Sequence, residues 1–387
     1  MQDGRPRLVF LVTEDWYFLM HRLPMALAAQ RAGYDVHVVC RVGNKGVEIS
    51  AHGFTLHHLD WRRGSLNPLH VTSIVRQVRD LYRRINPDIA HHVALQPVVI
   101  GSLAAIGLPV RRVNAFAGLG FVFVSRSLKA RLLRPIIVAI LRFFLNDGKS
   151  AAVVENSDDR AALAAIGIGE ERLNVISGSG LDVDKLRPLP ESKEGVTAAF
   201  VGRLLHDKGL RALIVAFELL HSHGERLRLL IAGEGDPANP ASISQVEIDS
   251  WKARPGIEVL GHVEGIQRVW ERAHIAVLPS RREGLPVSLL EAAALGRPIV
   301  ATDVPGCREI VRHGVNGFLV PADDALALSG ALAVLARDAG LRQRFGEAGR
   351  HIVETEFSSE RIGEQIVALY DRLLERNSGT DEPKRRL

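Results

Sequence analysis

The feature that most constrains the fold of this chain is a regular alternation of short apolar runs with longer segments of helical pattern. Arg7–Thr13 and Val36–Cys40 have the length and composition of buried strands. Leu23–Ala32 lies between them and has the pattern of a helix. This order predicts a βαβ unit. A chain built from such units is expected to be an α/β protein with parallel sheets covered by helices.

The same alternation continues to the C-terminal part of the chain. We expect further strands at Thr55–Leu59, Ile89–Val93, Val110–Phe116, Ala151–Val154, Val196–Val201, Leu227–Gly233, Ile257–Leu260, Ala273–Ser280, Pro298–Thr302 and Gly317–Val320. Helices are expected at Leu69–Ile85, after the capping residues Asn156–Asp159 up to Ile166, and at Val287–Leu295, Ala325–Ala336 and Glu360–Leu374.

The length of the chain sets its domain organisation. At 387 residues it exceeds a single core of ordinary size, so two domains are expected. The Pro-rich segment Pro188–Gly195 is the expected linker. The predicted parts are an N-terminal domain at 1–188, a C-terminal domain at 189–360, a closing helix at 361–376 and a polar, disordered tail at 377–387.

The composition narrows the class of protein. Cys40 and Cys307 lie far apart and no Cys-x-x-Cys pair occurs, which argues against a disulfide framework or a zinc ribbon and fits a reducing cytoplasm. Residues 1–6 are polar and lead directly into a strand, so no signal peptide is expected. No charge-free apolar run reaches about 18 residues, so we expect no membrane-spanning helix.

The net charge of +5 is distributed unevenly along the chain. Residues 1–190 contain 24 Lys and Arg against 16 Asp and Glu, whereas residues 191–387 contain 25 against 28. The first half is therefore basic and the second is not. A basic half indicates either a domain that meets a polyanion or an anionic surface, or simply a basic solvated face.

Two glutamates mark the strongest candidate site. Glu283 and Glu291 bracket a segment that follows the predicted strand Ala273–Ser280 and opens the predicted helix Val287–Leu295. The turn Gly284–Pro286 places free amides at the helix start, where an anion can bind. A carboxylate on each side can accept hydrogen bonds from hydroxyl groups, so the spacing suits a nucleotide sugar. The alternative is a first-turn acid that complements the helix dipole, followed by a solvated helix residue.

A second candidate site follows the predicted strand Val196–Val201. Gly202 ends this strand, and Arg203 and Lys208 lie in the loop after it. A diphosphate needs cations as well as amides: Arg203 can bind phosphate oxygens bidentately, and Lys208 supplies a mobile point charge. Two such cations could also be surface charges, but the preceding strand and the later Glu283 segment favour diphosphate ligands.

These segments resemble the donor site of the retaining family 4 glycosyltransferases. The resemblance extends over most of residues 8–375 and points to bacterial transferases that assemble lipid-linked oligosaccharides and polysaccharides. It is densest in the second half of the chain, in the segments Asn174–Pro188, Gly202–Gly209, Pro279–Pro286 and Glu291–Thr302.

The resemblance implies the GT-B fold, in which two Rossmann-like, doubly wound domains face each other across a cleft and the last helix returns to the first domain. It implies transfer of a hexose or N-acetylhexosamine from a nucleoside diphosphate sugar, expected to be UDP-linked, with retention of configuration. The expected acceptor is a lipid-linked oligosaccharide or a polysaccharide. No metal and no other cofactor is expected, because Arg203 and Lys208 do a metal's work at the diphosphate. No nucleic-acid partner is expected either.

The resemblance also assigns residues to the donor side. Arg203, Lys208 and Glu283 are the expected catalytic residues, with Glu283 on the transferred sugar and Glu291 on the ribose hydroxyls. The full set of expected donor-binding residues is Gly202, Arg203, Lys208, Gly233, Gly235, Val263, Glu283, Gly284, Leu285, Pro286 and Glu291.

The acceptor side is expected in the first half of the chain. The loop Glu14–Arg22 lacks the Gly-x-Gly-x-x-Gly pattern of a dinucleotide-binding domain. Trp16 and His21 are its candidate acceptor residues, although His21 could equally cap a helix. Family members often have a His after the strand Val110–Phe116. This chain lacks it, and the substitutes we expect are Asn114 and the amides of Gly118 and Gly120.

Three short motifs suggest metal ligands at first sight. The pairs His57-His58 and His91-His92 lie in or beside predicted strands, where adjacent side chains point to opposite faces, so neither pair can chelate one metal alone. Asp182-x-Asp184 resembles the metal motif of a different glycosyltransferase fold, but its place in a Gly-rich loop favours local turn capping.

Residues 125–145 combine basic and apolar side chains and contain no acidic residue. This combination is typical of a helix at a membrane interface. We therefore expect a protein that is cytoplasmic and bound peripherally to the inner face of the plasma membrane. The alternative is a core helix with a basic outer face. The expected contacts with anionic lipid are Arg126, Lys129, Arg131 and Arg134.

Two other functions are compatible with the same fold. One is a hydrolysing nucleotide-sugar epimerase, and the other is a non-catalytic protein that binds nucleotide sugars. An epimerase is expected to have its own acid and base residues, and a non-catalytic relative is expected to have lost Glu283, Arg203 or Lys208. All three residues are present, which favours the transferase.

Overall fold

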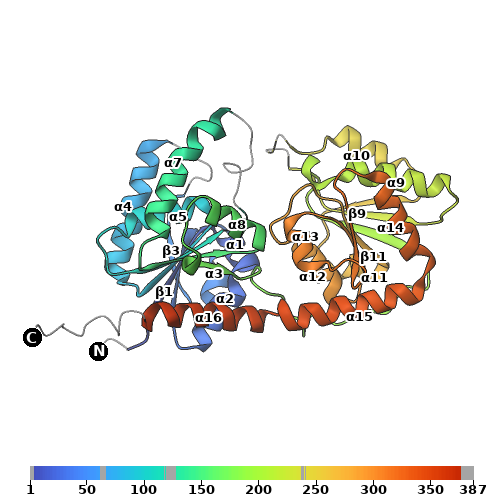
Figure 1. Cartoon of the computed structure of the whole chain (residues 1–387). Coiled ribbons are helices and arrows are strands. Elements are labelled where there is room, and N and C mark those ends of the chain that lie inside the picture. The colour runs from blue at the N-terminus through green and yellow to red at the C-terminus, as the bar shows by residue number, and fades with distance from the viewer. Residues whose placement is uncertain are drawn as a thin grey trace, which may run out of the picture. The chain divides into compact units, whose positions relative to one another are not determined.

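The computed structural model describes residues 4–61, 67–116, 118, 128–236, 239 and 241–375 (Figure 1). The chain forms two compact units. The first contains residues 1–180 and 359–387, and the second contains residues 181–358. Each unit is built on one parallel β-sheet with helices on both faces, so the prediction of two Rossmann-like α/β domains is confirmed. The predicted tail at 377–387 lies outside the described residues.

The sheet of the first unit has seven strands in the order β3-β2-β1-β4-β5-β6-β7. These are β1 (Arg7–Glu14), β2 (Asp35–Arg41), β3 (Thr55–His58), β4 (Ile89–Val93), β5 (Arg111–Phe116), β6 (Ser150–Val154) and β7 (Leu173–Val175). The helices of this unit are α1 (Asp15–His21), α2 (Leu23–Arg31), α3 (Gly46–Ala51), α4 (Pro68–Ile85), α5 (Leu95–Ala104), α7 (Leu128–Leu145), α8 (Ser157–Ala165) and α16 (Ser359–Glu375).

Strand β1 shows how the sheet separates two cores. Leu8, Phe10 and Val12 point into the cluster formed with α1, α2 and α16, whereas Val9 and Leu11 point into the cluster formed with α4 and α5. This alternation follows from the two-residue period of a strand. Because both faces are covered, the strand is apolar at nearly every position, as the sequence pattern predicts.

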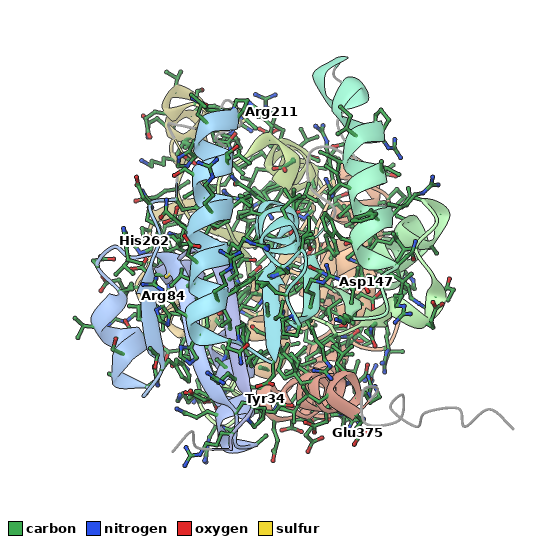
Figure 2. All side chains as sticks on the ribbon, turned by 90° about the vertical axis from the view of Figure 1, so that its left-hand side faces the viewer. Tyr34, Arg84, Asp147, Arg211, His262 and Glu375 are labelled. Atoms are coloured by element: carbon green, nitrogen blue, oxygen red, sulfur yellow. The ribbon has the colours of Figure 1, made fainter. Side chains whose placement is uncertain are left out.

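Helix α16 is the last described element of the chain and belongs to the first unit. It packs beside α2, and hydrogen bonds fix it to the rest of the unit. The Tyr34 hydroxyl donates to Asp371 Oδ1 at 2.6 Å, and Figure 2 shows Tyr34 close to this helix. The Tyr370 hydroxyl lies 2.6 Å from Nδ1 of the buried His91 in β4. The end of the chain therefore stabilises a domain whose other residues come from its beginning.

The sheet of the second unit has six strands in the order β10-β9-β8-β11-β12-β13. They are β8 (Thr197–Val201), β9 (Arg228–Ala232), β10 (Ile257–Gly261), β11 (Ile275–Leu278), β12 (Ile299–Thr302) and β13 (Gly317–Val320). The α-helices of this unit are α9 (Leu210–Ser222), α10 (Gln245–Lys252), α11 (Gln267–Arg272), α12 (Val287–Ala294), α13 (Pro305–Ile310), α14 (Ala325–Arg337) and α15 (Ala339–Glu356).

The topology of the second sheet indicates where a ligand can bind. The strand order reverses between β8 and β11, which are neighbours in the sheet. In parallel sheets of this kind, ligands bind at the carboxyl ends of the strands where the order reverses. A short 3-10 turn, η2 (His206–Lys208), lies in the loop between β8 and α9. A ligand site is therefore expected at the loops after β8 and β11.

The structure contains helices that the sequence-based prediction lacks, namely α1, α3, α5, α9, α10, α11, α13 and α15. The segment Glu14–Arg22, predicted as a loop, contains the helix α1, whose Phe18 packs edge-on against Phe10 with ring centroids 5.7 Å apart. Helix α15 is absent from the sequence-based prediction, because its glycines and charged residues obscure the helical pattern. Gly346 in this helix is needed for close packing, since a Cβ there would lie 2.1 Å from the carbonyl oxygen of Gly296.

In the part of the chain that the structure describes, no helix has both the length and the apolar character needed to cross a membrane.

Candidate active site

The loops after β8 and β11 are fastened to each other. The backbone N–H of Arg281 donates to the carbonyl of Asp207 at 2.8 Å. Gly209 has a φ of +71°, and a Cβ at this position would lie 1.9 Å from the carbonyl oxygen of Pro279. Only glycine allows this approach. The sequence segments Gly202–Gly209 and Pro279–Pro286 therefore belong to one local structure.

Lys208 and Glu283 meet at this junction. Lys208 Nζ lies 2.6 Å from Glu283 Oε1, and the two side chains are 18% and 10% exposed. The same Oε1 accepts a hydrogen bond from Ser280 Oγ at 2.5 Å. Among the described residues, no partner of Glu283 Oε2 is found. One carboxylate oxygen is thus held by the protein, and the other is available to a ligand.

Arg203 supplies a second cation next to the same loop. Its side chain is exposed, and it has no ion pair within the described ranges. The backbone around it is fixed, because Gly202 N donates to the carbonyl of Ala232 at 3.0 Å. A Cβ at Gly233 would lie 1.9 Å from the carbonyl oxygen of Gly202, so the two strand ends are in close contact. Gly202 and Gly233 thus shape the backbone from which Arg203 extends.

The segment after Glu283 leads into α12. The helix begins at Val287, and Pro286 is its N-cap residue, one position before the first helical residue. The first N–H groups of any α-helix lack partners within the helix and can face an anion. Leu285 and Val263 are partly buried and pack against the core of the second unit. Leu285 directly precedes the N-cap residue Pro286, whereas Val263 follows the edge strand β10.

Glu291 lies on α12, and its environment differs from that of Glu283. Among the residues described, its carboxylate has no hydrogen-bond or ion-pair partner. Burial raises the pKa of this carboxyl from 4.5 to about 7. An acceptor that is largely shielded from water and unpaired in the protein is suited to bind hydroxyl groups of a ligand.

We expect Glu291→Gln to stabilise the protein at pH 8 and to stabilise it less at pH 5. The pKa of Glu291 is higher in the folded than in the unfolded chain, so protonation favours folding. This contribution is fully present below about pH 4.5 and is lost as the pH rises through 7. Thermal unfolding of the variant and the wild type at both pH values measures the difference.

Glu247→Gln is the matched control for this measurement. Hydrogen bonds from Arg211 lower the pKa of the Glu247 carboxyl, so its replacement is expected to give no gain in melting temperature at pH 8. A gain of equal size at both pH values for Glu291→Gln would contradict the proposed cause.

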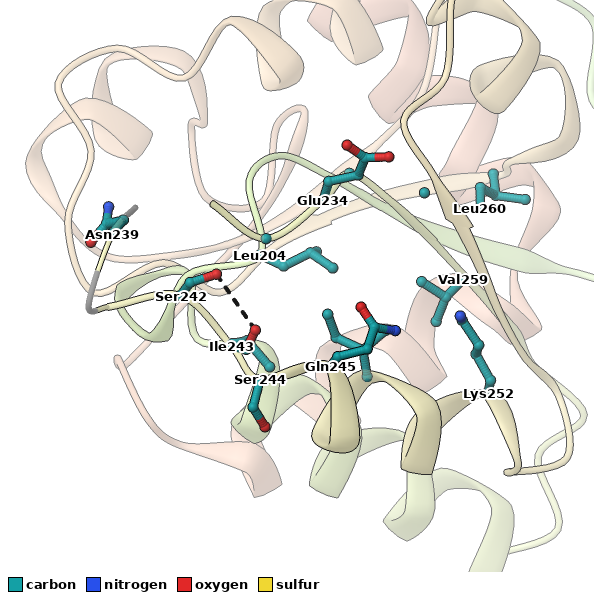
Figure 3. Close-up of a pocket in the computed structure, with 14 residues that line it drawn as sticks. Leu204, Glu234, Asn239, Ser242, Ile243, Ser244, Gln245, Lys252, Val259 and Leu260 are labelled. Carbon is teal, nitrogen blue, oxygen red and sulfur yellow. Dashed lines mark hydrogen bonds between the residues drawn. The ribbon is translucent and has the colours of Figure 1, made fainter. Parts of the chain in front are cut away.

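A cavity of about 750 Å³ opens beside the predicted donor residues Gly233 and Gly235 (Figure 3). Glu234 lies between these glycines, and its Oε1 accepts a hydrogen bond from the N–H of His262 at 3.2 Å. The predicted donor residues Gly233 and Gly235 line this cavity, whereas the sequence gives no signal for the contribution of α10, which supplies Gln245, Ile248 and Lys252. Its lining residues include Leu204, Ile243, Gln245, Lys252, Val259 and Leu260.

The candidate acceptor residues in the first unit have different environments. Trp16 is exposed on α1, so it is available to a ligand. His21 ends the same helix with its ring 4.5 Å from that of Tyr17, and burial lowers its pKa to about 4. It is therefore neutral at pH 7. Gly118 has a φ of +77°, and Gly120 lies outside the described residues.

The structure corrects the expectation for Asn114. Its side chain is fully buried in β5, where Oδ1 lies 2.8 Å from His92 Nδ1 and the amide nitrogen donates to Ser150 Oγ at 2.8 Å. These internal partners use the groups that an acceptor would need. The sequence could not show this, because strand periodicity alone does not tell which face of the sheet an Asn within the strand occupies.

The histidine pair in β4 and the Asp182-x-Asp184 motif, for which we expect no metal, have internal partners. His91 faces Tyr370 and His92 faces Asn114, so the two histidines lie on opposite faces of the sheet as predicted. Asp182 pairs with Lys185 at 3.0 Å within its own turn. Over the described ranges, no group of three His, Cys, Asp or Glu side chains is placed to hold a metal ion.

Two residues at the site, Ser280 and Thr302, lie in predicted strands, but the sequence-based prediction does not include them among the site residues. Both are buried, and the Thr302 hydroxyl donates to the carbonyl of Ser280. Each of them lies at or just after the end of a buried apolar strand. That position is the available signal, since the carboxyl ends of β11 and β12 meet at one edge of the sheet.

Comparisons with known proteins point to one class of enzyme. The family described as "Glycosyl transferases group 1" matches residues 195–338, and the family described as "Glycosyl transferase 4-like" matches residues 7–151. The capsular polysaccharide biosynthesis glycosyltransferase CapM of Staphylococcus aureus is 25% identical over 90% of this chain and 93% of its own length. An N,N'-diacetylbacillosaminyl-diphospho-undecaprenol alpha-1,3-N-acetylgalactosaminyltransferase of Campylobacter jejuni is 24% identical over 91% of this chain and 95% of its own length.

Solved structures show the same fold. A sucrose-phosphate synthase of Thermosynechococcus elongatus superposes with a TM-score of 0.81 at 18% identity, covering 96% of this chain and 100% of that one. HepE of Anabaena, solved in complex with UDP-glucose, superposes with a TM-score of 0.74 at 18% identity, covering 95% and 99%. The assignment of this chain to the glycosyltransferases of the GT-B fold is supported by three observations together: the family matches in both parts of the chain, the glycosyltransferase relatives, and the two parallel sheets.

Proposed function

We propose that the chain is a retaining family 4 glycosyltransferase that moves a hexose or N-acetylhexosamine from a nucleoside diphosphate sugar to a lipid-linked or polysaccharide acceptor. The observation that carries this proposal is the contact between Lys208 and Glu283 where the strand order of the second sheet reverses. A cation for the diphosphate and a carboxylate for the sugar stand side by side there. Arg203 adds a second cation that can bind phosphate oxygens bidentately.

In this proposal the diphosphate lies between Arg203, Lys208 and the start of α12. Glu291 accepts hydrogen bonds from the ribose hydroxyls, and Glu283 contacts the sugar. As the glycosidic bond breaks, negative charge grows on the leaving phosphate, and fixed cations stabilise it without a metal. A UDP-linked donor is supported by the complex of Anabaena HepE with UDP-glucose. A lipid-linked acceptor is supported by the name of the Campylobacter relative, which includes diphospho-undecaprenol.

The function is tested by incubating the protein with radiolabelled UDP-glucose, UDP-galactose, UDP-N-acetylglucosamine and GDP-mannose in the presence of a bacterial lipid extract. The expected result is label in the lipid or polysaccharide fraction, with and without EDTA. Epimerised nucleotide sugar would indicate the epimerase, and binding without turnover would indicate a non-catalytic protein. Loss of transfer in EDTA that magnesium or manganese restores would contradict the metal-independent mechanism.

We also propose that the first unit binds the inner face of the plasma membrane through α7. The helix presents an apolar stripe to solvent, because Ile136 and Phe143 are 57% and 72% exposed and Ala139 between them is exposed as well. An exposed apolar stripe flanked by basic residues favours an interfacial helix over a core helix. Of the predicted basic contacts, Arg134 is exposed. The structure does not describe the side chains of Lys129 and Arg131, and Arg126 lies outside the described residues.

We expect the double variant Ile136→Ser with Phe143→Ser to sediment poorly with vesicles that contain anionic lipid, whereas the wild type sediments with them. The apolar stripe and the basic residues both contribute to binding, so wild-type sedimentation should weaken with salt and on replacing Arg126, Lys129, Arg131 and Arg134 by Gln. Leu326→Ser, which alters an exposed leucine of the second unit, is the matched control. A wild type that ignores anionic and neutral vesicles alike would contradict the proposal.

A further inference from the structure

We propose that Ser280 is a positioning residue that keeps Glu283 oriented toward the transferred sugar while Lys208 engages the diphosphate. This inference rests on the proposed function of the site. It assigns a role in the transfer reaction to a fully buried residue that acts through Glu283.

Ser280 is built into the junction of two strands. It is fully buried and follows β11. Its carbonyl accepts a hydrogen bond from the hydroxyl of Thr302, the last residue of the neighbouring strand β12, which is 1% exposed. Neighbouring strands therefore fix the backbone of Ser280, and its hydroxyl has little freedom to move.

The hydroxyl is directed at a functional carboxylate rather than at the backbone. Ser280 Oγ donates to Glu283 Oε1 at 2.5 Å. A buried serine with a purely structural role can satisfy its hydroxyl on a backbone carbonyl, as Ser329 does by donating to Leu326 O at 2.8 Å. Because Ser280 is held by the neighbouring strand and donates to Glu283, this hydrogen bond fixes the orientation of the Glu283 carboxylate relative to the sheet.

The two donors on Glu283 Oε1 differ in what they can do during the reaction. Lys208 has a long, mobile side chain and is also the cation expected to meet the diphosphate. When phosphate oxygens compete for its ammonium group, its contact with Glu283 weakens. The hydroxyl of Ser280 has no such competing task, so it holds Oε1 in place and leaves Oε2 directed at the sugar. Placement of a reacting group by rigid neighbours is a recognised source of rate enhancement.

Ser280→Ala tests this role. We expect kcat for sugar transfer to fall by about 10-fold to 100-fold, which is the range expected for loss of a hydrogen bond to a charged group. Donor affinity, measured by calorimetry with the nucleotide sugar, should change by less than about twofold, since Arg203, Lys208 and Glu291 are intact. Ser329→Ala is the matched control, because it also removes a buried hydroxyl from the second unit but lies outside the site.

A double-mutant cycle separates positioning from general loss of stability. If Ser280 acts through Glu283, adding Ser280→Ala to Glu283→Gln should lower kcat little further. Additive losses, or an unchanged kcat in Ser280→Ala, would overturn the inference while the proposed function stands. If Ser280→Ala also lowers the melting temperature, the cycle still gives the answer. The same loss of stability then occurs when Ser280→Ala is added to the wild type and when it is added to Glu283→Gln, so it cancels in the comparison of kcat. A wild type that transfers sugar from no donor overturns the proposed function, and this inference with it.

Discussion

Lys208→Met is expected to lower kcat for sugar transfer by about 10²-fold to 10³-fold, which is typical for removal of a group that stabilises charge in the transition state. Lys208 is placed for this task, since Nζ lies where the loops after β8 and β11 meet, 2.6 Å from Glu283 Oε1. Methionine retains most of the length of the side chain and removes its charge. The effect should appear mainly in kcat, because charge on the leaving phosphate develops only as the bond breaks.

Steady-state kinetics with the best donor of the panel and thermal unfolding of the same samples check this expectation. Lys185→Met is the matched control, since Lys185 is an exposed cation of the second unit that pairs with Asp182 within its own turn. A loss of activity that follows the loss of melting temperature in both variants would mean that Lys208 has only a structural role. Equal changes in KM without a change in kcat would place its contribution in substrate binding instead.

Glu283→Gln is expected to lower kcat by at least about 10²-fold and to leave donor affinity nearly unchanged, whereas Glu291→Gln is expected to raise KM for the donor with a smaller change in kcat. The reason lies in the surroundings of the two carboxylates. Glu283 is held by Lys208 and Ser280 through one oxygen, as suits a group at the reacting sugar. Glu291 is largely shielded from water and unpaired among the described residues, as suits a group that binds hydroxyls.

The amide variants preserve the size of each side chain and remove its negative charge, so they test charge and not packing. Donor affinity from calorimetry and single-turnover rates with saturating donor distinguish the two roles. Glu347→Gln on the exposed side of α15 serves as a control for the loss of one carboxylate in the second unit. If both variants raised KM equally and left kcat unchanged, the division of roles between Glu283 and Glu291 would be wrong.

Much of the candidate site can be predicted because its residues follow strands. Parallel strands in a doubly wound sheet end at a common edge, so Arg203 after β8 and Glu283 after β11 can be assigned to one place from the sequence. Ser280 cannot be assigned in this way. A serine at the end of a strand has several possible hydrogen-bond partners, and only the packed loops show which one it uses.

Other predictions fail where the tertiary structure overrides local signals. Asn114 is expected on the acceptor side, but the packing of β4, β5 and β6 places its amide among internal partners. Helix α15 contains Gly346, which lowers helix propensity, yet the close contact with Gly296 requires a residue without a side chain. In both cases the partner comes from a distant part of the sequence.

The sequence by itself determined the α/β class, the succession of most strands, some of the helices, and the residue types at the carboxyl ends of the strands, because these depend on local periodicity and on short motifs. Only the tertiary structure decided that Lys208 and Glu283 form an ion pair, that Glu291 is shielded from water with a raised pKa, and that Ser280 holds Glu283. Contacts of this kind depend on how far apart two backbones lie after packing. Gly209, Gly233 and Gly346 show that in this chain such distances are set by the absence of a single Cβ atom.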